Sequence, residues 1–361
     1  MDRFLSLQLL IRVRLRRLSA ISLLVLLSAC HMVAPPVPDQ IKSDSGVALK
    51  AESMRGTLEA VVNGGGNLGR FAALNRYADS LGLADRTRSE GIDWFSLQRN
   101  LIIDIPGRSD ETIYLIAHYD KTDANPFSFV SLLVNGILDP IISATYLSDG
   151  AIDNASGVSV VLQLAEELSS GEHYYSYRVL FPGAEETGLR GSRAHIARLS
   201  DAERERIKYV INVDSVGVTG AGNCITAGVS DPHLSYLAQA VAKKAAIPLA
   251  QEPSSKTAVY DYLPFMETDF YTDVSYGLKF NHVGGLLPQR SWFTGEMSVP
   301  VINFSACGLM GGAADILSSF LLPIGKLHGF RDEINKIDIT TLYNQYAVIE
   351  GLLADLEYQS E

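Results

Sequence analysis

Residues 112–120 read Thr-Ile-Tyr-Leu-Ile-Ala-His-Tyr-Asp, an apolar and β-branched run that ends in a histidine and an aspartate. Such a run predicts a strand that is buried on both faces, in the interior of a sheet. His118 and Asp120 are two residues apart, so their side chains lie on the same face of an extended chain. A carboxylate beside an imidazole fixes the tautomer and ring orientation, which is the arrangement that a metal-bound histidine needs.

Strands and helices alternate on both sides of this run. Hydrophobic periodicity predicts strands at residues 98–105, 112–119, 178–181, 208–213 and 299–304. It predicts helices at residues 53–62, 71–81, 157–168, 235–246 and 340–356. The alternation indicates an α/β fold, a three-layer sandwich with a mostly parallel, twisted central sheet flanked by helices. We find no internal repeat and no interior linker, so residues 48–361 are predicted to form one domain.

The other residues able to carry chemistry follow predicted strands or precede a helix, where open α/β sheets build their sites. They are Asp153, Glu185, Glu186, Asp214, His328 and Asp332. Taken singly, Asp153 fits a helix cap and the two glutamates fit a solvated pair. Asp214 is harder to explain in that way, because an unpaired aspartate at the end of an apolar strand is costly to bury. Asp332 lies four residues after His328, close enough for a carboxylate–histidine pair.

In chain order these residues form a set of motifs: His-x-Asp, Asp-Asn-Ala-Ser-Gly, Glu-Glu-Thr-Gly-Leu-Arg-Gly-Ser, Asn-x-Asp and a late His. On these motifs the sequence resembles the co-catalytic zinc aminopeptidases of clan MH. That family includes bacterial leucyl aminopeptidases, glutamate carboxypeptidase and the transferrin receptor ectodomain. The resemblance covers residues 98–217 and resumes at residues 260–265, 299–301 and 328–332. It implies a phosphorylase/hydrolase-like zinc peptidase fold.

The resemblance also implies a cofactor of two zinc ions and a role for each residue. His118 and Asp214 would hold one ion, Glu186 and His328 the other, and Asp153 would bridge them. Glu185 would be the general base, and Asp120 would orient His118. Two divalent cations and three carboxylates leave one positive charge, which a bridging hydroxide would neutralise.

Two metals about 3.5–4 Å apart can hold both a nucleophile and the carbonyl oxygen of a peptide bond. A neighbouring carboxylate can take the proton of the water and return it to the leaving amine. The expected function is therefore that of a metal-dependent exopeptidase, a di-zinc aminopeptidase that hydrolyses N-terminal residues from peptides. The sequence leaves the preferred N-terminal residue and the oligomeric state open.

Three alternatives stay open. In the di-zinc carboxypeptidases and aminoacylases the bridging aspartate usually precedes Lys-Gly and a lid domain interrupts the chain, neither of which is present here. A glutaminyl cyclase is the second alternative, and a binding scaffold without catalysis is the third, although all five ligands are present. The sequence departs from the family at Tyr262, where many members have a histidine. The apolar residues 121–148 are interpreted as short helices packed on the core rather than a flap or lipid-contacting patch, and residues 269–298 look inserted.

Residues 1–29 are predicted to be a lipoprotein signal peptide. Five arginines precede the apolar residues 21–27, and Leu-Ser-Ala-Cys at 27–30 resembles the bacterial lipobox, which implies lipidation of Cys30. Residues 30–47 are predicted to be a flexible tether, within which the proline-rich residues 33–39 form a stiff, extended stretch. His31 stands where an inner-membrane retention signal would favour aspartate, so the expected location is the cell envelope, with the outer membrane favoured.

The composition narrows the classes of partner. The 361 residues carry a net charge of -11, which argues against a nucleic-acid-binding surface because phosphates require clustered Lys and Arg. Removing residues 1–29 takes away five Arg and one Asp and leaves 25 basic and 40 acidic residues, a net charge of -15. Three cysteines exclude a disulfide scaffold. A disulfide between Cys224 and Cys307 stays open, because the sequence does not give their separation.

Overall fold

The computed structural model describes residues 31–93, 96–122, 147–253, 260–266, 299–309 and 327–360. The predicted signal peptide, Cys30, most of the apolar segment 121–148 and all of residues 269–298 lie outside these ranges. Residues 34–361 form one compact unit. Among the described helices, none has the length and apolar character needed to span a bilayer.

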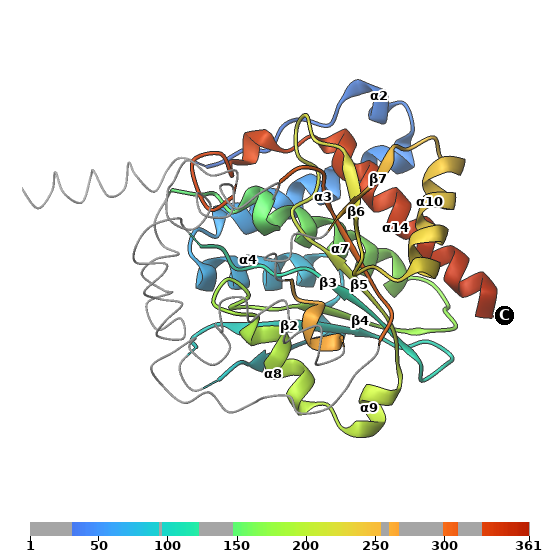
Figure 1. The fold of residues 1–361 in the computed structure, drawn as a ribbon. Helices are drawn as coiled ribbons and strands as arrows, with labels where there is room; N and C mark the ends of the chain where they lie inside the picture. Colours follow the sequence, from blue (N-terminus) through green and yellow to red (C-terminus); the bar gives the residue numbers. More distant parts are fainter. Residues whose placement is uncertain are drawn as a thin grey trace, which may run out of the picture. The chain divides into compact units, whose positions relative to one another are not determined.

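A sheet of eight strands forms the centre of the described structure, in the order β1-β2-β4-β3-β5-β8-β6-β7 (Figure 1). The strands are β1 (Thr87–Gly91), β2 (Arg99–Ile105), β3 (Thr112–Ile116), β4 (Ser176–Phe181), β5 (Ile207–Val213), β6 (Asn223–Ala227), β7 (Leu249–Pro253) and β8 (Val301–Ala306). The four middle strands, β4, β3, β5 and β8, are parallel. β2 runs antiparallel to β4 and to β1, and β6 runs antiparallel to β8 and parallel to β7. The predicted α/β class with a mostly parallel sheet is confirmed.

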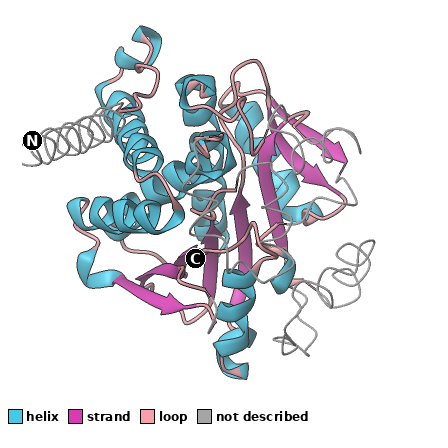
Figure 2. Cartoon of the chain, turned by 90° about the vertical axis from the view of Figure 1, so that its left-hand side faces the viewer, coloured by secondary structure: helices cyan, strands magenta, loops and turns pink. Residues whose placement is uncertain are grey.

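Helices cover both faces of the sheet and complete three layers (Figure 2). One face carries α3 (Ser45–Asn63), α4 (Asn67–Ser80), α7 (Ser156–Ser169), α10 (Pro232–Lys244) and α14 (Ile339–Ser360). The other face carries α8 (Arg190–Arg198) and α9 (Asp201–Glu205). Short helical turns lie at η1 (Ala84–Arg86), η2 (Ala151–Ala155), η3 (Leu263–Phe265) and η4 (Ile334–Lys336).

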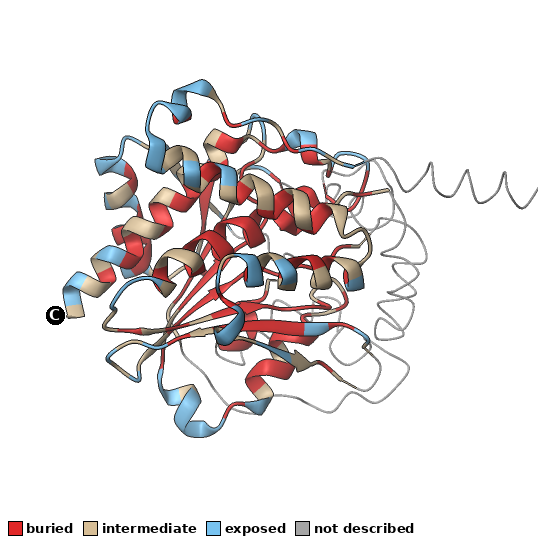
Figure 3. Cartoon of the chain, turned by 180° about the vertical axis from the view of Figure 1, so that it is seen from behind, coloured by how far each residue is buried: buried red, intermediate tan, exposed pale blue. Residues whose placement is uncertain are grey.

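The apolar pattern of α7 explains its central place. The predicted stripe, which includes Val158, Leu162 and Leu168, is buried, and so are Val160 and Leu164 on the opposite side. A helix with buried apolar residues on opposite sides is covered by neighbours on more than one side. α7 packs between the sheet and the helices α3 and α14, and Figure 3 shows it buried together with the middle strands.

The strands that the sequence did not predict lie at or next to the sheet edges. β1 reads Thr-Arg-Ser-Glu-Gly and β7 reads Leu-Ala-Gln-Glu-Pro, and neither has the apolar content of a buried strand. Both are edge strands, where polar residues and proline protect against further pairing. α3 begins at Ser45, earlier than predicted, because the Asp44 side chain accepts hydrogen bonds from the Gly46 and Val47 amides and caps the helix.

The prediction of a flexible tether at residues 30–47 is wrong for residues 34–47. Residues 34–47 belong to the compact unit, and Asp39–Lys42 forms the short helix α2. Ala34 and Val37 are buried, and the Ala34 amide donates to Glu59 Oε1 of α3 at 2.9 Å. The segment packs on the domain despite its prolines, because burying its apolar side chains there is favourable.

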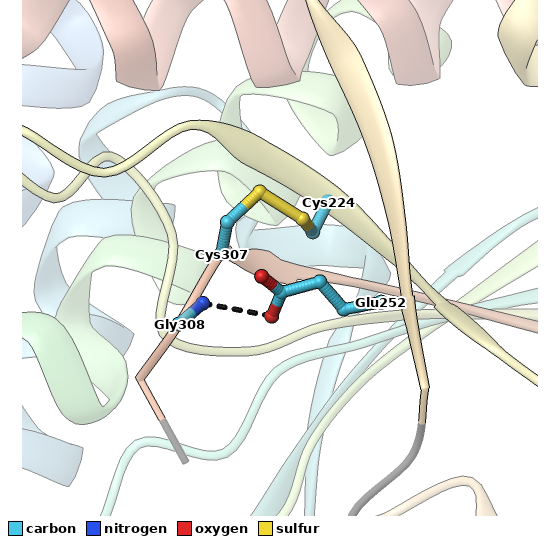
Figure 4. Close-up of a disulfide and its surroundings, with 4 residues drawn as sticks. All are labelled: Cys224, Glu252, Cys307 and Gly308. Atoms are coloured by element: carbon cyan, nitrogen blue, oxygen red, sulfur yellow. Dashed lines mark hydrogen bonds between the residues drawn. A yellow bond between two sulfur atoms is a disulfide. The ribbon is translucent and has the colours of Figure 1, made fainter. Parts of the chain in front are cut away.

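A disulfide joins Cys224 of β6 to Cys307 just after β8, with a Cα–Cα distance of 5.2 Å (Figure 4). These strands are antiparallel neighbours, so the sheet itself brings the two cysteines together. Beside the disulfide, Glu252 of β7 accepts a hydrogen bond from the Gly308 amide at 2.7 Å. The pairing that the sequence left open is therefore formed in the structure.

Candidate active site

The five predicted metal ligands meet at one edge of the sheet. His118 follows β3, Glu186 follows β4 and Asp214 follows β5, and these three parallel strands end at the same edge. Asp153 lies in η2, directly before α7, and His328 lies in the turn that precedes η4. The predicted gathering of side chains from distant parts of the chain is thus what the structure contains.

The distances divide the ligands into two groups that share Asp153. His118 Nε2 lies 3.0 Å from Asp153 Oδ1 and 3.5 Å from Asp214 Oδ2. His328 Nε2 lies 3.2 Å from Asp153 Oδ2 and 3.1 Å from Glu186 Oε2. Within each group, one nitrogen or oxygen atom per residue lies within 4.8 Å of the others. Asp153 presents one oxygen to each group, as a carboxylate between two metal ions would.

The donor atoms fit zinc, which binds histidine nitrogen and carboxylate oxygen in this kind of mixed set. Glu186 supplies a further sign: its Oε1 atom is buried and has no hydrogen-bond partner among the described residues. A buried carboxylate oxygen without a partner is costly, and a bound cation would remove that cost.

The electrostatics of the cluster also favour cations. Burial raises the pKa of Glu185 well above its usual range, and the nearby carboxylates of Glu186, Asp261 and Asp214 raise it further against the opposing charge of His118. Burial likewise raises the pKa of Glu186, to about 7. For His118, burial alone would lower the pKa, but the charges of Glu185 and Asp214 outweigh it and raise the pKa strongly. Crowded carboxylates of this kind are stabilised by divalent cations.

Asp120 connects the loop after β3 to the loop after β4. Its carboxylate is fully buried and accepts hydrogen bonds from the Glu185 amide at 3.1 Å and the Glu186 amide at 3.3 Å. His118 Nδ1 lies 3.5 Å from Asp120 Oδ1 and 3.2 Å from the Asp120 carbonyl oxygen. The aspartate therefore lies where an orienting partner of His118 is expected, and it also fixes the backbone of both glutamates.

Asp332 supports the loop of Asp153. Its Oδ1 accepts hydrogen bonds from the Ile152 amide at 2.6 Å and the Asp153 amide at 3.4 Å, and Ser148 Oγ donates to its Oδ2 at 2.8 Å. The pair with His328 that the spacing suggested stays a prediction, and residues 328–332 form bends and turns rather than a helix.

The Asp-Asn-Ala-Ser-Gly motif ties Asp153 to the end of β5. Asn154 Nδ2 donates to the Val213 carbonyl at 2.9 Å, and its Oδ1 accepts from the Ser215 amide at 3.1 Å. Gly157 is required because a Cβ atom there would overlap the Val213 carbonyl oxygen. The motif thereby holds Asp153 and Asp214 in fixed relation.

Asp261 is a buried carboxylate to which the sequence analysis gave no role. It lies just before η3, it is 1% exposed, and neither oxygen has a well-formed hydrogen bond from the described residues. Burial raises its pKa to about 7, against the opposing charge of His118, and Asp120 and Asp214 raise it as well. The signal in the sequence is a single aspartate between two tyrosines. Of these, Tyr262 packs in the core on the α8 side of the sheet.

A comparison with known families decides the identity of this fold and site. The sequence profile of peptidase family M28 matches residues 100–348. The chain belongs to this family. The M28 match includes all five candidate ligands, Glu185 and Asp120. The resemblance to clan MH that the motifs indicated is confirmed.

Individual relatives agree with the M28 assignment. The chain is 30% identical over 145 residues to an aminopeptidase from Pseudomonas aeruginosa, an alignment that covers 39% of this chain and 26% of that protein. A leucine aminopeptidase precursor from Bacteroides thetaiotaomicron has a TM-score of 0.57 at 16% identity, covering 84% of this chain and 96% of that one. A glutaminyl cyclase from Porphyromonas gingivalis has a TM-score of 0.55 at 18% identity, covering 85% and 98%. At these identities the two structures show the shared fold. The chain spans about a quarter of the length of the Pseudomonas relative.

Proposed function

We propose that this M28 protein is a di-zinc aminopeptidase. The observation that carries the proposal is the division of five buried ligands into two groups that share Asp153. His118 and Asp214 would hold one zinc ion, and Glu186 and His328 would hold the other. The ions, when bound, would polarise the peptide carbonyl and lower the pKa of water.

Glu185 would be the residue that moves the proton. It belongs to neither ligand group. Its carboxylate is nevertheless close enough to Asp214 and His118 for their charges to change its pKa. Its amide is held by Asp120 Oδ1, so the backbone that carries the carboxylate is fixed. In the proposed reaction Glu185 takes a proton from the attacking water and gives it to the amine of the leaving peptide.

The charge of the surroundings favours an aminopeptidase over a carboxypeptidase. A carboxypeptidase must pair the C-terminal carboxylate of its substrate with a cation, whereas an aminopeptidase must pair an ammonium group with an anion. Three cationic side chains are buried among the described residues: Arg70, Lys121 and Arg190. Each is bound to the protein itself, through the Tyr119, Asp149 and Gly150 carbonyls, the Ser148 carbonyl and Asp93, respectively. Asp261, by contrast, is a buried carboxyl group near Glu185 that has no well-formed hydrogen bond among the described residues, and a substrate ammonium group would favour its ionised form.

Hydrolysis of aminoacyl anilides tests the proposal. The protein should cleave anilides with a free α-amine, should leave N-acetylated anilides intact, and should lose activity on chelation and regain it with two equivalents of zinc. Equal cleavage of free and blocked substrates would contradict aminopeptidase chemistry. A glutaminyl anilide separates the remaining alternative, because a cyclase would release ammonia from it without releasing the aniline.

We also propose that the mature chain begins at a lipidated Cys30 in the bacterial cell envelope, with the outer membrane favoured. The pattern of residues 1–30 supports this, and so does the Cys224–Cys307 disulfide, since disulfides persist in exported proteins. Cys30→Ser should abolish labelling by radioactive palmitate and move the protein from the membrane to the soluble fraction, with its specific activity unchanged. Membrane association that survives this substitution would contradict the lipid anchor.

A further inference from the structure

We propose that Arg70 is a positioning residue that holds the two loops of the metal site in register. Arg70 lies in α4, which is outside the residues that match the M28 family. Its side chain is fully buried, on the helix face turned toward the site rather than toward solvent. The inference rests on the proposed metal site, and it adds a residue from the N-terminal helices to that site.

The guanidinium of Arg70 donates to three backbone carbonyls in two separate loops. Nε donates to the Tyr119 carbonyl at 2.6 Å, and Tyr119 stands between His118 and Asp120. Nη1 donates to the Asp149 carbonyl and Nη2 to the Gly150 carbonyl, both at 2.9 Å. The second loop leads directly to the bridging ligand Asp153. Because the guanidinium is planar and rigid, these bonds fix the distance between the two loops.

The backbone around Arg70 is shaped to receive it. Gly150 has a positive φ of 60°, and a Cβ atom there would lie 2.9 Å from Arg70 Nη1 and 2.7 Å from Lys121 Cβ. At the end of α3, Gly64 lets the backbone of α4 approach closely, since a Cβ on it would lie 2.6 Å from the Arg70 amide nitrogen. Gly150 thus leaves room for the guanidinium, and Gly64 leaves room for the backbone that carries it.

A second residue of α4 also binds the loop after β3. Asn67 lies one helical turn before Arg70 and therefore on the same face. Its side chain donates to the Lys121 carbonyl at 3.1 Å and accepts from the Lys121 amide at 2.9 Å. The loop after β3, which carries His118 and Asp120, is accordingly held by two side chains of α4.

Arg70 also brings a positive charge to an acidic region. Burial lowers the pKa of its guanidinium to about 10, while the charges of Asp332, Asp120 and Asp153 act in the opposite direction, so it stays protonated at neutral pH. Lysine would keep this charge but lose the planar fork, and methionine would lose both. The two substitutions therefore separate positioning from charge.

The test compares Arg70→Met and Arg70→Lys with Arg76→Met, an exposed arginine on the same helix. We expect Arg70→Met to weaken zinc binding, measured by competition with a chromophoric chelator, by roughly 10–100-fold, as for other outer partners of metal ligands. The loss should appear in kcat rather than KM. Arg70→Lys should recover part of the affinity, and Arg76→Met should equal the wild type.

Hydrogen–deuterium exchange of the metal-free protein gives a readout that does not depend on activity. In both Arg70 variants, amides of residues 116–122 and 148–155 should exchange faster than in Arg76→Met, and the far sheet edge should be unchanged. Folded Arg70 variants with wild-type exchange in both loops and wild-type zinc affinity would overturn the inference. Should Arg70→Met fail to fold, Arg70→Lys decides by the same criteria. A wild-type protein that binds no zinc would refute the proposed function, and the exchange of the two loops would still decide the role of Arg70.

Discussion

Replacing Glu185 with glutamine should lower kcat by about 10²–10⁴-fold while both zinc ions stay bound. Glutamine has the size and shape of glutamate, but its amide cannot take a proton from water. The substitution spares both ligand groups, since Glu185 belongs to neither. The measurements are kcat on the best aminoacyl anilide and zinc content by atomic emission.

Two matched variants sharpen this result. Glu186→Gln changes the adjacent residue in the same way but removes a ligand whose Oε2 lies 3.1 Å from His328 Nε2, so it should lose zinc as well as turnover. Glu172→Gln alters an exposed glutamate and should behave as the wild type. Wild-type rates in Glu185→Gln would exclude the general-base role, and loss of zinc from it would show that the assignments of the two glutamates are reversed.

The sequence predicts the middle of this fold well for a physical reason. The parallel strands β3, β4 and β5 are buried on both faces, so their apolar runs are long and clear, and the residues after them are expected at one edge. His118, Glu186 and Asp214 were found in that way. The edge strands were missed because they are partly exposed to solvent. Their sequences are therefore polar, like those of loops.

Other parts of the site could not be predicted, because their role depends on contacts between distant segments. Arg70 is a single arginine in an amphipathic helix, and such a residue is normally exposed. Only the packing of α4 against the loops after β3 and before η2 shows what its guanidinium binds. Asp332 is similar: its spacing to His328 suggested a pair with that histidine, but its hydrogen bonds with the amides of the Asp153 loop could not be foreseen.

Replacing Asp153 with asparagine should weaken both zinc sites together, which is the second large effect that we expect. Asp153 Oδ1 faces His118 and Oδ2 faces His328, so one side chain serves both groups. Asparagine keeps one oxygen acceptor and removes the negative charge that two cations would share. We expect the affinity of each site to fall by about 10²-fold or more, beyond the 10–100-fold typical of outer partners, and turnover to fall with it.

The bridging role is separated from a general disturbance of the loop by two comparisons. Asp149→Asn changes a partly exposed aspartate four residues earlier, whose Oδ2 accepts from the Ile334 amide, and it should retain two zinc ions. Asp214→Asn removes a ligand from one group alone and should weaken one site while the other stays near wild-type affinity. If Asp153→Asn behaved like Asp214→Asn, with one tight zinc ion left, the two groups would not depend on a shared carboxylate. Asp153 would then be a ligand of one site alone, and the bridging assignment would have to be abandoned.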